Sequence, residues 1–266
     1  MTTPSTRPLA AVTGASSGIG YELAKQFARH GYDLVVAAED AGVTAAGRDF
    51  ADLGAAVEPV QADLATHGGV EDLYARIKAD GRPLEAVAIN AGVGVSGPFA
   101  ETPLEPDLRL VDLNVRSSVH LAKRCVQLMA PRGAGRILFT SSIAATQPGP
   151  FEASYAASKA FLLSFSEALR EELRDSGITV TALMPGPTQT NFFARAGMED
   201  TRLGAGRKDS AEQVAREGFE ALMAGRDHVV AGSVRNRIVA GAAKVTPETL
   251  KARLHRNVSR PGSARK

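Results

Sequence analysis

Short runs of apolar residues alternate with longer segments of helical periodicity along most of the chain. The first apolar run spans 9–13, and the segment after it carries Leu23 and Phe27 on one helix face before Gly31 ends it. The run at 34–38 has no polar alternation, which is typical of a strand buried on both faces. The same patterns predict further strands at 57–60, 86–90, 136–140, 178–183 and 228–230, and further helices at 72–79, 106–130 and 156–175.

Strict alternation of strands and helices predicts a doubly wound parallel sheet of about seven strands, with helices on both faces, in an α/β fold. A chain of 266 residues is long enough for one such domain, 1–266, and requires no second. In sheets of this kind ligands bind beyond the carboxyl ends of the strands. Residues that directly follow strands are therefore the first candidates for chemistry.

The composition argues against nucleic-acid and membrane partners. Trp is absent and aromatic residues make up 5% of the chain, so stacking platforms for bases are not expected. The first eight residues are too short and polar for a signal peptide, and no apolar run reaches the ~18 residues of a membrane span. Cys125 is the single cysteine, which fits a reducing compartment, and we expect a cytoplasmic protein.

Positive charge is concentrated at the C-terminal end. Residues 251–266 carry six Lys and Arg and no acid, which leaves 25 basic against 29 acidic residues before them. A role of this basic tail in binding nucleic acid or membrane is one interpretation. A solvated or partly disordered terminus is the one we favour.

A glycine-rich loop, TGASSGIG, lies between the first predicted strand and the first helix. Glycines let the backbone approach a pyrophosphate closely, and free N–H groups with the helix dipole attract the anion. A plain tight turn is the alternative, but the position in the first βα unit favours a phosphate cradle of Rossmann type. The cofactor-binding residues predicted here are Gly14, Ser16, Ser17, Gly18, Ile19 and Gly20.

Two further strand ends carry candidate cofactor contacts. Asp63 and Leu64 follow the third strand, where a carboxylate and an apolar side chain would lie beside an adenine ring. Asn90, Ala91 and Gly92 follow the fourth strand and supply a floor of small residues along which a cofactor could pass. Each segment taken alone is also compatible with an ordinary turn or cap.

Tyr155 and Lys159 are four residues apart at the start of a predicted helix, so their side chains share one face. A free tyrosine has a pKa of about 10, and a neighbouring ammonium lowers that pKa towards the range useful for proton transfer. An exposed helix pair is the alternative interpretation. Ser142, at the end of the fifth strand, could hydrogen-bond a substrate oxygen.

Asn114 is a polar residue inside the long helix predicted at 106–130. Its side chain could bend the helix by bonding to the backbone. Alternatively, it holds a water that links Lys159 to solvent.

Together these residues resemble the short-chain dehydrogenase/reductase family in its common form of roughly 250 residues. The resemblance extends from Leu9 to about Gly232. It rests on the loop from Thr13 to Gly20, on Asn90-Ala91-Gly92, and on the order of the remaining motifs. The family often has a second Asn where this chain has Ile89. The other matching positions are the tetrad Asn114, Ser142, Tyr155 and Lys159, and the nicotinamide-contacting segment with Pro185, Gly186, Thr188 and Thr190.

The resemblance implies an NAD(P)-dependent oxidoreductase and a role for each member of the tetrad. Tyr155 would exchange a proton with the substrate oxygen while hydride moves to or from the nicotinamide. Lys159 would lower the pKa of the tyrosine and bind the nicotinamide ribose. Ser142 would polarise the carbonyl, and Asn114 would position the relay water.

The end of the second strand bears on the choice between NAD and NADP. An acid there binds the ribose hydroxyls of NAD, whereas an arginine receives the 2′-phosphate of NADP. The family usually has the NAD-selecting Asp at the position of Ala38 and the NADP-binding Arg at that of Glu39, so this chain departs from both patterns. A carboxylate at Glu39 should repel a 2′-phosphate, and Arg48 is the nearest cation downstream. We therefore favour NAD.

Substrate selection is expected at 93–99, at 143–151 and after Pro185. There, 191–225 is predicted as a lid and helix region, with a flexible lid at 191–208 that carries Phe192 and Phe193 and a helix that starts after Ser210. A helix packed permanently on the core is the alternative. The five histidines show no ligand-like spacing along the sequence, so no metal site is expected. The resemblance further implies a homodimer or homotetramer built through the helices that carry Asn114 and Tyr155.

Three functions agree with these observations. The favoured one is hydride transfer between NAD and the carbonyl or alcohol of a small apolar substrate. The second is an NADP-dependent ketoreductase of acyl or steroid-like substrates. The third is a nucleotide-sensing protein without catalysis, which the intact tetrad argues against.

Overall fold

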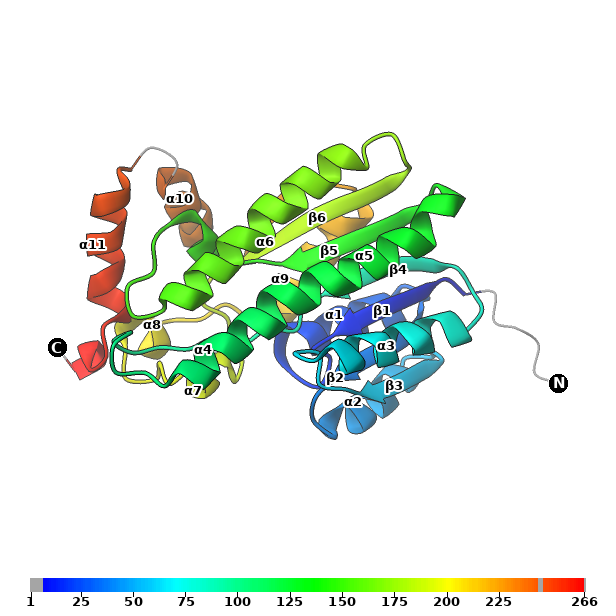
Figure 1. Cartoon of the computed structure of the whole chain (residues 1–266), viewed down its shortest axis with the longest axis horizontal. Helices are drawn as coiled ribbons and strands as arrows, with labels where there is room; N and C mark the ends of the chain where they lie inside the picture. The colour runs from blue at the N-terminus through cyan, green and yellow to red at the C-terminus, as the bar shows by residue number, and fades with distance from the viewer. Residues whose placement is uncertain (1–6, 244–245, 266) are drawn as a thin grey trace.

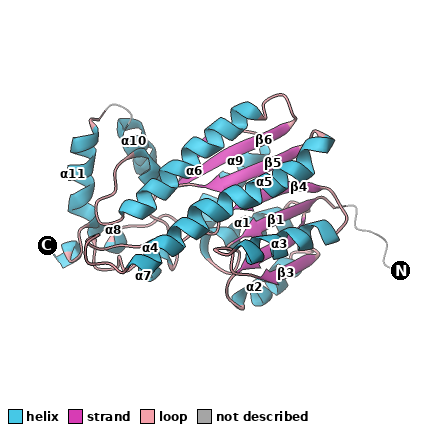
Figure 2. Cartoon of the chain, viewed as in Figure 1, coloured by secondary structure: helices cyan, strands magenta, loops and turns pink. Residues whose placement is uncertain are grey.

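Seven parallel strands form the centre of the molecule in the computed structural model, which describes residues 7–243 and 246–265 (Figures 1 and 2). Their order across the sheet is β3-β2-β1-β4-β5-β6-β7. The predicted doubly wound sheet is confirmed. The strands are β1 Leu9–Thr13, β2 Asp33–Ala38, β3 Val57–Gln61, β4 Leu84–Ile89, β5 Gly135–Thr140, β6 Ile178–Pro185 and β7 His228–Ala231.

Helices cover both faces of this sheet because side chains on both faces of the central strands are apolar. Every residue of β1 and β2 is buried, as the uninterrupted apolar runs predict. One face packs against α1 (Gly18–Arg29), α2 (Gly42–Ala51) and α9 (Ala211–Met223). The other face packs against α3 (His67–Ala79), α5 (Ser117–Met129) and α6 (Ala153–Glu172).

The strand order changes direction at β1, which pairs with β2 on one side and with β4 on the other. Loops that leave the carboxyl ends of β1 and β4 therefore turn to opposite faces of the sheet. Such a switch point opens a crevice between them, where open α/β sheets bind ligands. The glycine-rich loop after β1 and the Asn90–Gly92 segment after β4 lie at this point.

The helix predicted at 106–130 is a nearly continuous rod with an irregular turn at its centre. It consists of α4 (Leu104–Val111), a π-helical turn (Asp112–Arg116) and α5. Asn114 lies in the π turn. Such turns are rare and occur frequently at functional sites.

Helix α3 begins at His67, five residues before the predicted start at 72. The side chain of Thr66 caps it by accepting a hydrogen bond from the amide of Gly69 at 3.0 Å. Glycines at 68 and 69 hide this start from an analysis of apolar periodicity. The cap places His67 and Glu71 on the helix.

The segment predicted as a lid and helix region, 191–225, has two parts with different surroundings. The short helices α7 (Phe192–Arg195) and α8 (Arg202–Ala205) line a cleft at the carboxyl ends of the strands. Helix α9 instead packs on the core, with Val214 and Phe219 buried. The helix predicted to start after Ser210 is present as α9, and the lid role of 191–208 stays a prediction. Ser210 caps α9 through the amide of Gln213, as its sequence indicates.

The expectation of a solvated basic tail is also wrong. Residues after β7 form α10 (Val234–Ala243), α11 (Glu248–Ser259) and a short 3-10 turn (Ser263–Arg265). On α11 the side chains of Lys251, His255 and Ser259 are buried, because they bond to loops of the main body. Figure 1 shows α10 and α11 as a pair at the end of the molecule away from β3. Among the described helices, none is both long enough and apolar enough to cross a membrane.

Candidate active site

A cleft of about 900 Å³ runs along the carboxyl ends of the strands, from the glycine-rich loop to α11. It brings together the predicted cofactor contacts and three members of the predicted tetrad, Ser142, Tyr155 and Lys159. Asn114 lies behind it, completely buried. The cofactor-contact positions that line it are Gly14, Ser16, Ser17, Gly18, Ile19, Glu39, Asp63, Leu64, Asn90, Ala91, Gly92, Pro185, Gly186, Thr188 and Thr190.

The glycine-rich loop forms a cradle that side chains would fill. Gly14 and Gly18 have φ values of +67° and +60°, a region of backbone conformation that favours glycine. Gly20 lies just behind the loop, where an added Cβ would be 2.2 Å from the carbonyl oxygen of Gly14. Ser17 occupies the N-cap position of α1 without a side-chain cap bond, which leaves the helix N-terminus open to an anion.

Asn90 and Thr13 join three neighbouring strands beneath this cradle. The hydroxyl of Thr13 accepts hydrogen bonds from the amides of Asn90 and Ala91 at 2.9 and 3.0 Å. The side chain of Asn90 donates to the carbonyl of Thr13 at 3.0 Å and accepts from the hydroxyl of Thr140 at 3.0 Å. The segment predicted as a floor of small residues is thus fixed by a polar side chain. A side chain at position 92 would be crowded, because an added Cβ would lie 3.0 Å from Asn114 Oδ1.

At the far end of the cleft, Glu39 and Asp63 are held together by Arg109, a residue that the sequence analysis missed. Arg109 donates to Glu39 at 2.7 Å and to both oxygens of Asp63 at 3.0 and 3.1 Å. These hydrogen bonds lower the pKa of the Asp63 carboxyl below its ordinary value. Arg48, the cation considered from the sequence, does not line the cleft.

Tyr155 lies at the inner end of the cleft, near the start of α6, with its ring 5.0 Å from that of Phe192. Burial raises the pKa of its phenol well above the ordinary value, a hydrogen bond with Ser142 lowers it, and the charge of Glu152 raises it further. The phenol is therefore protonated near neutral pH.

Lys159 is buried one turn after Tyr155, and its Nζ donates to the carbonyl of Thr140 at 2.9 Å. Burial lowers the pKa of this ammonium from 10.5 to about 8. Its Nζ is 5.7 Å from the centre of the Tyr155 ring. The influences on the Tyr155 pKa here are burial, Ser142 and Glu152, so the activation by Lys159 stays a prediction.

The Asn114 side chain is fully engaged by protein groups. Its amide nitrogen donates to the carbonyl of Val93 at 2.9 Å and to the hydroxyl of Ser158 at 3.0 Å, and its Oδ1 accepts from the amide of Val93. Asn114 therefore fixes the loop after β4 against α6. Its role towards a relay water stays a prediction.

Ser142 and the segment after β6 line the cleft together with Tyr155. The Ser142 hydroxyl accepts from the amide of Ala144 at 3.1 Å and donates to the carbonyl of Pro185 at 3.4 Å. Thr188 bonds to the carbonyl of Gly186, and Thr190 accepts from the amide of Phe192. The two segments are thus joined at the point where the predicted nicotinamide contacts lie.

Helix α11 fastens the substrate side of the cleft. Lys251 donates to the carbonyl of Thr146 at 3.0 Å, and Ser259 donates to the carbonyl of Pro150 at 2.8 Å. Between them, the ring of His255 bonds to Gln147 at 2.8 Å and to the buried carboxylate of Glu152. Apolar side chains complete this wall, namely Phe192, Leu203, Val239, Leu254 and Val258.

Two features outside the cleft complete the comparison with the sequence. Cys125 is fully buried, and burial raises its pKa to about 12, which excludes a reactive thiolate at neutral pH. The histidines are scattered along the sequence, but the fold brings His67 and His120 together, with their rings stacked 4.7 Å apart beside Glu71. Since 53 residues separate them, spacing along the sequence gave no signal.

Comparison with known proteins decides the family. The sequence pattern of short chain dehydrogenases matches residues 8–200. The chain belongs to the short-chain dehydrogenase/reductase family. The probable oxidoreductase EphD of Mycobacterium tuberculosis is 35% identical over 191 residues, which cover 71% of this chain but only 32% of that protein. The 3-oxoacyl-(acyl-carrier-protein) reductase FabG of Escherichia coli is 30% identical over 78% of this chain and 86% of its own length.

Solved structures of this family show the same fold. A short-chain dehydrogenase from Sphingobium yanoikuyae in complex with NADPH has a TM-score of 0.78 at 30% identity, covering 89% of this chain and 94% of its own. A 3-ketoacyl-(acyl-carrier-protein) reductase from Brucella melitensis complexed with NADH has a TM-score of 0.76 at 25% identity, covering 86% and 98%.

Proposed function

We propose that this member of the short-chain dehydrogenase/reductase family transfers hydride between NAD and the carbonyl or alcohol of a small apolar substrate. The observation that carries the proposal is the position of Tyr155. It lies in one cleft with the glycine cradle after β1, beside Ser142 and the segment after β6. The open N-terminus of α1 and the cradle at Gly14–Gly20 fit the pyrophosphate of a dinucleotide.

The residues of the cleft have separable roles in this reaction. The nicotinamide, when bound, supplies or accepts the hydride. Tyr155 gives the proton to the substrate oxygen, or takes it in the reverse direction. Ser142 hydrogen-bonds the same oxygen and polarises the carbonyl. Lys159 binds the ribose and stabilises the phenolate that remains after proton transfer.

The protonation of Tyr155 favours carbonyl reduction as the starting direction. Burial raises the pKa of the phenol, so the hydroxyl carries its proton near neutral pH. A proton donor is what reduction of a carbonyl requires, whereas alcohol oxidation needs the phenolate first. In the reverse direction, Lys159 must therefore supply the missing stabilisation of the phenolate.

Substitution of Tyr155 by Phe tests this function. We expect kcat to fall by about 10²–10⁴-fold, the usual contribution of a general acid, while binding of NADH is unchanged. Turnover is followed through nicotinamide absorbance with a panel of ketones and alcohols. Tyr74→Phe is the matched control, since Tyr74 lies on α3 away from the cleft. Full activity of Tyr155→Phe would refute the assignment, and wild-type inactivity across the panel with tight NADH binding would support a nucleotide sensor.

The charges around the ribose position support NAD. Glu39, Asp40 and Asp63 line this end of the cleft, and Arg109 supplies a single guanidinium, which is already bonded to Glu39 and Asp63. A 2′-phosphate would bring further negative charge to a carboxylate-rich site. We therefore expect NADH to bind more tightly than NADPH. Tighter binding of NADPH in a fluorescence titration would overturn this preference.

An NADP-dependent ketoreductase of acyl substrates is the second candidate, because two observations favour it. Arg109 lies at the ribose end of the cleft, where it donates to Glu39. Arginine is the residue that accommodates the 2′-phosphate in NADP sites, so Arg109 could turn from Glu39 to that phosphate. Arg195, Arg207 and Arg235 line the cleft and form no ion pair with any described residue, which suits a substrate with an anionic group. The same titration, together with activity on acyl thioesters, distinguishes the two candidates.

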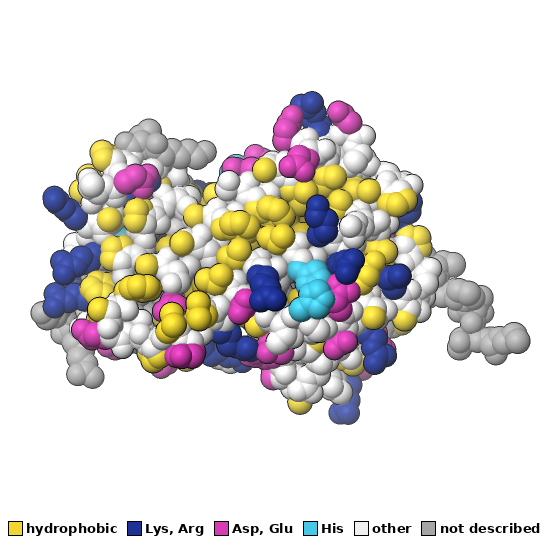
Figure 3. Space-filling model, in the orientation of Figure 1, with side chains coloured by type: hydrophobic (Ala, Val, Ile, Leu, Met, Phe, Trp, Pro, Cys, Tyr) yellow, Lys and Arg dark blue, Asp and Glu magenta, His cyan; other side chains and the backbone are white. Residues whose placement is uncertain are grey.

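The substrate and assembly follow from the remaining surfaces. The apolar wall of Phe192, Leu203 and α11 supports an apolar substrate. Leu104 and Leu108 on α4 and Phe161 on α6 are exposed apolar residues, and α4 contacts α6. Figure 3 shows hydrophobic side chains gathered on this face of the molecule, which supports a homodimer or homotetramer through these helices.

A further inference from the structure

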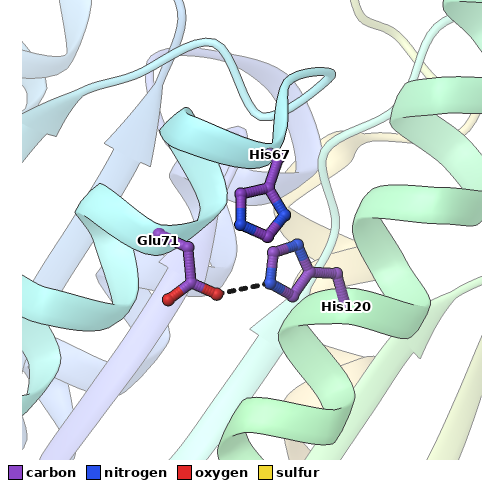
Figure 4. Close-up of side chains that lie close together, drawn as sticks. All are labelled: His67, Glu71 and His120. Carbon is purple, nitrogen blue, oxygen red and sulfur yellow. Dashed lines mark hydrogen bonds and ion pairs between the residues drawn. The ribbon is translucent and has the colours of Figure 1, made fainter.

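Two histidines and a glutamate lie together on the face of the molecule formed by α3 and α5, outside the cleft (Figure 4). His67 and Glu71 are four residues apart on α3, so their side chains share one face of that helix. His120 reaches them from α5, which packs against α3. Figure 3 shows histidine atoms at the surface of this face.

The donor atoms of the three side chains are close enough to share an ion. One ring nitrogen of each histidine and one carboxylate oxygen all lie within 4.8 Å of one another. In a zinc site with bonds of about 2.1 Å, neighbouring ligand atoms are roughly 3.4 Å apart. Side-chain rotations are sufficient to close that difference, since the His67 side chain is exposed and the other two are partly exposed.

Each donor is in a suitable state. Nε2 of His120 is 2.5 Å from Oε1 of Glu71, so an ion would replace the proton between them. The ring of His67 forms no hydrogen bond with residues in the described part of the chain and stacks on the ring of His120. Oε1 of Glu71 accepts hydrogen bonds from His120 and from Arg124, so it already faces the ring that would share the ion.

Arg124 is the group that opposes an ion here. Its Nε donates to Oε1 of Glu71 at 2.8 Å, and its guanidinium lies 5.2 Å from the ring of Tyr74. Hydrogen bonds of this kind orient carboxylate ligands in many metal sites, but the positive charge reduces affinity for a cation. Removal of Arg124 therefore distinguishes two interpretations of the cluster. If the cluster is only a set of ion pairs, loss of Arg124 disrupts it; if it is a metal site, loss of Arg124 increases its affinity for the cation.

We propose that His67, Glu71 and His120 bind a divalent transition-metal ion of the zinc class, which links α3 to α5. Two imidazoles and one carboxylate are the donors that Zn²⁺, Ni²⁺ and Cu²⁺ prefer, whereas Mg²⁺ takes oxygen ligands. Water completes the coordination on the exposed side. The ion holds the beginning of α3, directly after the turn that carries Asp63, and so stabilises the folded chain.

Calorimetric titration of the untagged full chain with ZnCl₂ tests the site. We expect one zinc per chain in the wild type and a rise in the thermal midpoint with zinc. His67→Ala and His120→Ala should each weaken zinc binding by at least ~10-fold. His228→Ala is the matched control and should bind as the wild type does, because His228 lies on β7 and not on α3 or α5, and is paired with the preceding Asp227.

Two further measurements separate a metal site from an ion-pair cluster. Arg124→Gln should bind zinc more tightly than the wild type, and MgCl₂ should produce no comparable heat. Absence of stoichiometric zinc binding in the wild type, or equal binding in His67→Ala and His120→Ala, would overturn the proposal. Because His67 is exposed, we expect His67→Ala to fold as the wild type does. The circular dichroism of each variant verifies that it is folded.

Discussion

The buried ammonium of Lys159 should make the protein less stable at neutral pH than it would be with an apolar side chain. Burial lowers the pKa of Lys159 from 10.5 to about 8. At about 1.36 kcal/mol for each pKa unit, holding the charged form in the folded chain costs about 3 kcal/mol. Substitution by Met keeps a long unbranched side chain and removes the charge.

The sign of this effect depends on pH in a defined window. Between pH 8 and 10.5 the unfolded chain binds more protons at this lysine than the folded chain, so wild-type stability rises with pH there. The cost is fully present below pH 8 and is relieved as the pH rises towards 10.5. In Lys159→Met this contribution is absent at every pH.

The measurement is urea unfolding at pH 7 and pH 10, followed by far-ultraviolet circular dichroism. At pH 7 the gain in Lys159→Met is partly offset by the lost bond to the carbonyl of Thr140, worth about 1.5–3 kcal/mol. The difference between variant and wild type should then shift by roughly 2–3 kcal/mol in favour of the wild type at pH 10. Lys123→Met, at an exposed position on α5, is the control and should show no such shift. An equal difference at both pH values would refute the argument.

Four other changes test separate parts of the structure. Gly92→Ala should lower kcat about 10-fold or more in the nicotinamide absorbance assay, because its Cβ would lie 3.0 Å from Asn114 Oδ1 and 3.3 Å from Lys159 Nζ. His255→Leu should raise KM for the substrate with unchanged NADH affinity, since it breaks the anchor of α11 at Glu152; a matching loss of NADH affinity would contradict this. Arg109→Ala should weaken NADPH binding more than NADH binding in fluorescence titrations, and the opposite order would refute the charge argument. Leu108→Glu should shift light scattering towards a smaller assembly, and an unchanged mass would exclude this face as the interface.

The parts of the molecule governed by local patterns could be predicted from the sequence. Strands such as β1 and β2 are continuous apolar runs because both of their faces are covered, and the glycine-rich loop carries its own signal. The segment around Tyr155 and Lys159 is similarly local, since one helical turn joins them.

The parts that depend on distant pairing could not be predicted. Arg109 meets Glu39 and Asp63 across 70 and 46 residues, so no spacing along the chain signals their contact. Helix α11 was mistaken for a solvated tail because the residues that it buries are polar, with Lys251 and His255 among them. Its anchoring partners lie more than 100 residues earlier in the chain. A polar composition predicts that such a segment is exposed. The acceptors that allow its polar side chains to be buried, such as the carbonyl of Thr146 and the carboxylate of Glu152, are brought near only by the fold.

Because α11 is anchored to the main body, two separate stretches of the chain form the two walls of the cleft. The proposed dinucleotide contacts come from strand ends in the first three quarters of the sequence, whereas the outer wall comes from α7, α8, α10 and α11. The handful of hydrogen bonds from α11 to residues 146–152 is the joint between the halves. Replacement of α10 and α11 by a different pair of helices, attached at residues 146–152, should change substrate specificity and leave the proposed hydride-transfer site unchanged. Proteins of this fold can therefore diverge in the substrate that they bind without changes to the central sheet.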